Sequence, residues 1–87
     1  MKRNPDFILR SVADTQILVP VGAAANTFTG MVTVNGTSAY LWELLETDKT
    51  EEALVKAILD RYDIDEATAR PDVRKFIETL SEIGAIQ

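Results

Sequence analysis

The side chains that most often carry out chemistry in proteins are missing from this sequence. None of its 87 residues is a histidine or a cysteine. Nucleophilic sites of the Ser-His-Asp and Cys-His kinds are therefore excluded, and so are the usual zinc sites. Disulfide and thiolate chemistry are excluded for the same reason. Carboxylates, hydroxyls, lysines and arginines are the chemically capable groups that remain.

Carboxylates could in principle hold a hard cation such as calcium or magnesium. One stretch of the chain is rich in them: Glu43, Glu46, Asp48, Glu51 and Glu52. Their spacing does not match a calcium-binding loop. We interpret them as a solvated acidic face and predict no metal site.

The overall charge narrows the possible partners. Lysine and arginine number 9, aspartate and glutamate 14, and the net charge is −5. Nucleic-acid backbones are bound by clustered Lys and Arg, so this composition disfavours them. No apolar run approaches the ~20 residues that span a bilayer, and no apolar stretch of a signal peptide follows the basic N-terminus. We expect a cytoplasmic protein that makes no membrane contact.

The first half of the chain has the pattern of short strands. Apolar runs at 7–10 and 16–19, joined by a polar link at Asp14-Thr15, predict a β-hairpin that ends at Pro20. The small residues of 21–26 predict a flexible surface loop. A third strand is expected over 28–34, with Gly30 at a bulge or at its start.

A strand passes directly into a helix between Val32 and Leu45. Alternating residues lead into Asn35-Gly36, a turn pair, and Thr37 or Ser38 is expected to cap the helix. The helix should run from about 37 to 46. We interpret Trp42, the only tryptophan, as a core anchor.

Two further helices follow. Thr50 and Asp65 are their expected N-caps, and the second helix should end near 62–63. Pro71 falls inside the third helix, where we expect a kink or a restarted helix. The apolar stripe of the third helix consists of Ala69, Val73, Phe76, Leu80 and Ile83.

Three strands followed by three helices predict a single α+β domain over 1–87, with a three-stranded antiparallel sheet followed by a three-helix bundle of winged-helix type, in the order β-β-β-α-α-α. The final residues, 85–87, should form an extended tail.

The order and spacing of these motifs resemble the PqqD family of RiPP recognition elements. The resemblance covers almost the whole chain. It rests on Asn4-Pro5 before the first strand, on Val34-Asn35-x-Thr37-x-x-x-Leu41-Trp42-x-Leu44, and on the cadences from Thr50 to Ile64 and from Val73 to Gly84. Pro71 and the alanine-rich segment 21–26 depart from the family pattern.

The resemblance implies a binding protein without catalysis and without a cofactor. In this family the leader of a ribosomally made precursor peptide adds as a strand to the third strand and lies against the third helix. The partner is frequently a radical SAM maturase. An open sheet edge is suited to strand addition, because it offers unpaired N–H and C=O groups.

The candidate peptide-binding residues fall in two groups. The first is the third strand, Gly30, Met31, Val32, Thr33 and Val34, through its backbone. The second is one flank of the third helix, Arg70, Val73, Arg74 and Ile77. The helical wheel alone does not decide which flank of this helix faces the sheet edge, and Ile77 could equally belong to the core.

Two other classes of function remain as alternatives. A winged-helix nucleic-acid-binding or regulatory protein should have a basic third helix, but here Arg70, Arg74 and Lys75 alternate with acidic residues. An acidic carrier protein should have an exposed serine at a helix start, typically preceded by aspartate. Ser38 instead follows Gly36-Thr37. The sequence leaves open the identity of the peptide, of its maturase and of its product, and whether the chain is a monomer or a homodimer.

Overall fold

The first half of the chain forms a three-stranded antiparallel sheet. In this computed structural model, which describes residues 1–26 and 30–87, β1 (Phe7–Val12) pairs with β2 (Thr15–Pro20), and β2 pairs with β3 (Val32–Val34). The sheet order is β1-β2-β3, so β2 is the central strand. The predicted hairpin is confirmed. The third strand is shorter than the 28–34 expected, and 27–29 lie outside the described residues.

The loop predicted over 21–26 is wrong in part. Residues Gly22–Asn26 form a short 3-10 helix, η1, that begins at a glycine with a positive φ of 56°. Small side chains allow this tight turn, and Ala24 within it belongs to the buried core. The segment therefore packs against the domain instead of passing loosely over it.

Three α-helices make up the second half: α1 (Gly36–Leu44), α2 (Glu51–Arg61) and α3 (Glu66–Glu82). Two predicted N-caps are confirmed. The Ala53 amide donates to Thr50 Oγ1 at 3.1 Å, and the Thr68 amide donates to Asp65 Oδ1 at 2.9 Å. In the described part of the chain, no helix has the length and apolar character needed to cross a bilayer.

Pro71 does not divide the third helix, so the expected restart is not found. A single helix runs from Glu66 to Glu82 with Pro71 inside it. A proline removes one backbone hydrogen bond and costs about 3 kcal/mol. The buried stripe continues in phase on both sides, through Ala69 before the proline and Val73 and Phe76 after it. Packing of this stripe offsets the lost bond.

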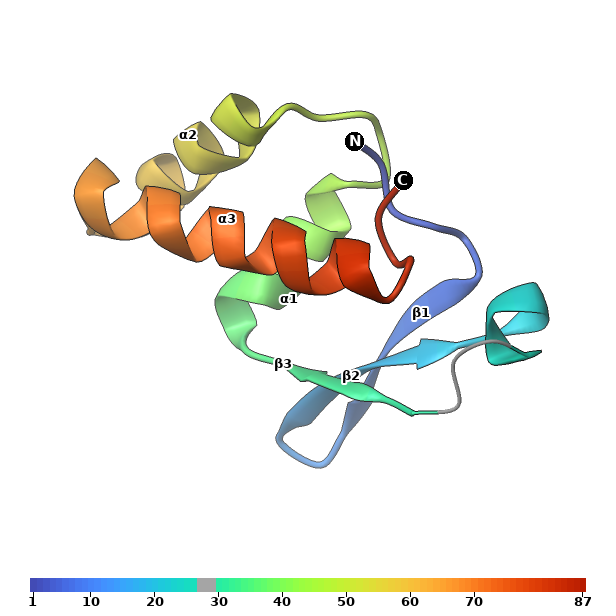
Figure 1. Cartoon of the computed structure of the whole chain (residues 1–87). Helices are drawn as coiled ribbons and strands as arrows, with labels where there is room; N and C mark the ends of the chain where they lie inside the picture. Colours follow the sequence, from blue (N-terminus) through green and yellow to red (C-terminus); the bar gives the residue numbers. More distant parts are fainter. Residues whose placement is uncertain (27–29) are drawn as a thin grey trace.

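The helices cover one face of the sheet (Figure 1). Leu9, Leu18 and Val32 lie opposite one another across the three strands, and Leu18 is completely buried. Side chains alternate between the two faces of a strand, so the neighbouring row, Arg10 and Ile17 with Thr33, faces away from the helices. Trp42, 2% exposed, is in the core as predicted.

The two ends of the chain lie side by side (Figure 1). Arg3 and Ile86 form an antiparallel bridge, in which the Lys2 amide donates to the Gln87 carbonyl at 2.9 Å and the Gln87 amide donates back at 2.8 Å. The extended tail predicted for 85–87 is confirmed. Its Ala85 is fully buried, so this bridge closes the core at the end of α3.

We predict that Leu18→Ala lowers the free energy of unfolding by about 2–5 kcal/mol, because it leaves a cavity in the central strand. This is a large part of the roughly 5–15 kcal/mol that stabilises a typical domain. Urea denaturation followed by the fluorescence of Trp42 measures the change. Val12→Ala is the control, because Val12 is 58% exposed and should change stability by less than about 0.5 kcal/mol. Equal losses in both variants would contradict the placement of the core.

Candidate functional site: an open strand edge beside helix α3

The outer edge of β3 is free to accept another strand. β2 occupies one side of β3, and no other strand of the described residues pairs with its second side. Such an edge presents unpaired N–H and C=O groups, which an extended peptide can satisfy. The sheet has a second free edge at β1, so the surroundings of each edge decide which one is the better site.

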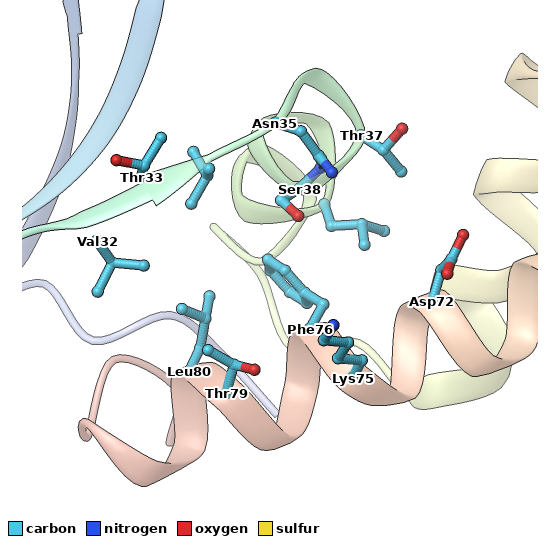
Figure 2. Close-up of a pocket in the computed structure, with 12 residues that line it drawn as sticks. Val32, Thr33, Asn35, Thr37, Ser38, Asp72, Lys75, Phe76, Thr79 and Leu80 are labelled. Carbon is cyan, nitrogen blue, oxygen red and sulfur yellow. Dashed lines mark hydrogen bonds between the residues drawn. The ribbon is translucent and has the colours of Figure 1, made fainter.

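A groove of about 290 Å³ lies between β3 and α3 (Figure 2). It is lined by β3, by the first turns of α1 and by one side of α3. Its lining residues are Val32, Thr33, Val34, Asn35, Thr37, Ser38, Leu41, Asp72, Lys75, Phe76, Thr79 and Leu80. The β3 edge therefore has a place for side chains next to its backbone groups.

The junction between β3 and α1 lines part of this groove. Asn35 is the N-cap of α1: its Oδ1 accepts the Ser38 amide at 2.8 Å. The prediction that Thr37 or Ser38 caps the helix is wrong. Asn35 has the extended backbone geometry that is typical of an N-cap. Its side chain reaches the amide of Ser38, the third residue of the helix. Thr37 and Ser38 instead lie in the first turn and line the groove.

The groove has an apolar floor and a polar rim. Leu41, Phe76 and Leu80 are at most 6% exposed and belong to the hydrophobic core, while their outer surfaces line the groove. The rim is formed by hydroxyls and by two charged residues, Asp72 and Lys75. This is the composition expected of a site that buries apolar side chains and orients them with a few polar contacts.

Residues of α3 reach the groove at helical spacing. Asp72, Lys75, Phe76, Thr79 and Leu80 follow an i, i+3, i+4, i+7, i+8 pattern, which places them on one side of the helix. In Figure 2, Asp72 lies toward Thr37, and Thr79 and Leu80 lie toward Val32. The groove therefore runs along about two turns of α3.

The strand half of the predicted site is at this groove. Val32, Thr33 and Val34 line it, and Val32 points from β3 toward α3 (Figure 2). Gly30 and Met31 lie just before β3, outside the groove lining. Met31 is 65% exposed.

The helix half of the predicted site lies elsewhere. None of Arg70, Val73, Arg74 and Ile77 lines the groove. Val73 is buried in the core, and Ile77 is half-buried against it. The groove residues that the sequence analysis missed are Asp72, Lys75, Phe76, Thr79 and Leu80.

The two arginines tie α3 to the start of α2. Arg70 donates to both carboxylate oxygens of Glu52, at 2.6 and 3.0 Å, and to Glu66 at 3.3 Å. Arg74 donates to Glu51 at 3.0 Å. Glu51 and Glu52 in the first turn of α2 were a sequence signal for this pairing, since opposite charges on successive helices attract. From these charges, the flank of α3 that carries the arginines could have been predicted to face α2, and the opposite flank to face the groove.

These contacts shift the ionisation of the groups involved. The hydrogen bond and the charge of Arg70 hold the pKa of Glu52 below its ordinary value, and Glu52 in turn raises the pKa of Arg70. The hydrogen bond from Thr68 lowers the pKa of the cap residue Asp65. Within the described residues, no group of three or more acidic side chains gathers in a way that could hold a metal ion.

The fold and the groove define a small α+β domain with an unpaired edge strand beside a helix. The family described as Coenzyme PQQ synthesis protein D (PqqD) matches residues 16–86, and the chain belongs to this family.

Two solved structures have the same fold. One, "TbiB1 in Complex with the TbiA(beta) Leader Peptide", is 23% identical, with a TM-score of 0.76, and the match covers 100% of this chain and 95% of that one. The other, "Lasso peptide synthetase B1 complexed with the leader peptide", is 15% identical, with a TM-score of 0.73, and the match covers 99% of this chain and 95% of that one. No curated protein sequence matches the chain.

We predict that Arg70→Gln raises the pKa of Glu52 toward its ordinary value of 4.5, because the charged donor is removed. A carboxylate with a lowered pKa stabilises the folded state above its unfolded pKa, and this contribution is lost as the pH falls through the folded pKa. The Arg70–Glu52 pair should therefore stabilise the folded state near neutral pH, and this stabilisation should be lost in acid. A carboxyl-detected NMR titration measures the pKa directly. Lys75→Gln, on the other flank of α3, is the control and should leave the titration of Glu52 unchanged.

Proposed function

We propose that this protein is a non-catalytic binding module that captures the leader of a ribosomally synthesised precursor peptide by strand addition. The captured leader pairs with β3 and lies against α3. The module presents the peptide to a modifying enzyme in the cytoplasm, such as a radical SAM maturase. The observation that carries the proposal is the unpaired edge of β3 beside a groove with an apolar floor. Membership in the PqqD family and the leader peptides bound in both similar structures support it.

The energetics of the groove suit a reversible complex. Each backbone hydrogen bond to β3 contributes only about 0.5–1.5 kcal/mol. A micromolar complex requires about 8 kcal/mol, and binding must also offset the ordering of the peptide. An apolar side chain that becomes buried contributes about 1.5–3 kcal/mol. Side chains placed on Phe76 and Leu80 are therefore needed in addition to the backbone pairing.

The free edge of β1 is the less suitable site. The hollow beside it is wider, about 720 Å³, and is formed by the N-terminal segment, β1, α1 and the C-terminus. Trp42 and Glu43 of α1 line this hollow, but its volume is more than twice that of the groove beside β3. A peptide at this edge would lack a narrow groove for its side chains.

The nucleic-acid-binding alternative lacks support at α3. Arg70 and Arg74 are held by Glu51, Glu52 and Glu66. These pairs would have to be released before the two arginines could bind phosphates, and the net charge of −5 opposes the binding of nucleic acid.

Titration of the isotope-labelled protein with the leader of a candidate precursor peptide tests the proposal. Amide shifts should be confined to residues 31–34 and to the groove side of α3. Shifts confined to residues 7–12 of β1, or no saturable shifts, would contradict it.

We predict that Thr79→Arg weakens binding of this leader at least about tenfold. The new side chain fills the groove, and the loss of one buried anchor is equivalent to about 1.4 kcal/mol or more. Thr79 is exposed, so the fold should be retained. Ser81→Arg is the matched control: it adds the same side chain to an exposed site of α3 outside the groove and should bind normally. Fluorescence anisotropy of the labelled leader measures both affinities, and equal affinities would place the peptide elsewhere.

A further inference from the structure

Two oppositely charged side chains in the groove form no ion pair within the described part of the chain. Asp72 and Lys75 both line it, and neither side chain forms an ion pair or hydrogen bond with any other side chain that the structure describes. The opposite flank of α3 differs sharply, because Arg70 and Arg74 are both paired with glutamates. The groove thus keeps one free carboxylate and one free ammonium at its rim.

The spacing of these charges fits an extended peptide. Measured from Asp72 along the axis of α3, Lys75 lies about 4.5 Å away, Phe76 about 6 Å away and Leu80 about 12 Å away. An extended strand presents every second side chain to the same face, at intervals of about 6.8 Å. Three alternate side chains of the peptide therefore lie over Asp72, over the Lys75–Phe76 pair, and over Leu80.

We propose that this groove selects leaders with a fixed order of side chains: basic over Asp72, acidic two residues further along over Lys75, and apolar two residues beyond that, against Leu80 and Val32. The acidic position favours glutamate over aspartate. Its methylene groups can pack on Phe76 while its carboxylate reaches the flexible Lys75 side chain at the rim. This inference rests on the proposed strand addition to β3.

The order of charges along a bound peptide depends on the direction in which it runs. β3 runs from Val32 toward Val34, and Asp72 lies at the end of the groove that β3 reaches last. A peptide antiparallel to β3 therefore carries its basic residue N-terminal to its acidic one. A parallel peptide carries them in the reverse order.

Selection from a displayed library of random peptides, performed on the unmodified protein and on Lys75→Glu and Asp72→Lys, tests the inference. The unmodified protein should enrich peptides with a basic and an acidic residue two positions apart. Lys75→Glu should invert the preference at the acidic position alone, and Asp72→Lys at the basic position alone. A peptide selected by the unmodified protein should bind Lys75→Glu about fivefold to tenfold more weakly. Replacing the glutamate of this peptide by lysine should restore its affinity for Lys75→Glu.

Matched controls separate the groove from the overall charge. Lys56→Glu and Asp60→Lys make the same charge changes at exposed positions of α2 outside the groove, and they should select the same peptides as the unmodified protein. Identical selections by Lys75→Glu and by Lys56→Glu would overturn the inference.

NMR mapping of the enriched peptides distinguishes the two proposals. Peptides that shift the amides of 32–34 but show no charge preference overturn the charge order and leave strand addition intact. Peptides that bind without affecting β3, or a library that yields none, overturn both.

Discussion

The row of Leu9, Leu18 and Val32 across the sheet has to be kept from water, and the helices that follow in the chain cover it. Packing against helices is one of the ways in which a small sheet becomes independently stable. Because β2 is central, the row ends at β3 on one side. α3 then has to lie close to β3 to complete the cover, and the unpaired edge of β3 comes to lie beside a helix. The same packing that stabilises the domain therefore creates the groove.

In the proposed binding mode, three core residues serve both stability and binding. Leu41, Phe76 and Leu80 are nearly buried in the core, and their outer surfaces form the floor of the groove. A floor built from core residues is rigid, since close-packed interiors leave side chains little freedom. Rigidity lowers the entropic cost of binding an extended peptide, which itself loses much freedom. A small domain with few hydrogen bonds to offer needs this advantage.

Local patterns in the sequence predicted most of the fold. Alternating residues predicted the hairpin, and the helical stripe predicted α3 and its buried face. Thr50 and Asp65 were predictable caps, because each depends on contacts within four residues. The cap of α1 was not predicted correctly, since Asn35, Thr37 and Ser38 all carry a suitable oxygen. Only the backbone geometry at Asn35 decides between them.

The flank of α3 that forms the groove could not be predicted from α3 alone. A helical wheel is nearly symmetric about its buried stripe, so Arg70 and Lys75 look equivalent on either side. The choice depends on α2, whose first turn places Glu51 and Glu52 beside the arginines. This is a contact between helices, and periodicity within one helix contains no information about it. The strand half of the candidate site came from the resemblance to the PqqD family, in which the leader pairs with the third strand.

In recognition through a strand edge, different groups provide the affinity for a peptide and the selectivity between peptides. The backbone groups of β3 accept any extended peptide, since they contact no side chain of it. Discrimination then falls to the rim of the groove, where Asp72, Lys75 and Thr79 are exposed and contribute little to the core. Changes at these three positions would alter the preferred peptide at small cost in stability, whereas changes at Phe76 or Leu80 would disturb the fold as well. In the proposed binding mode, a domain built in this way can acquire a new peptide by substitutions on the outer side of a single helix, while the sheet edge stays the same.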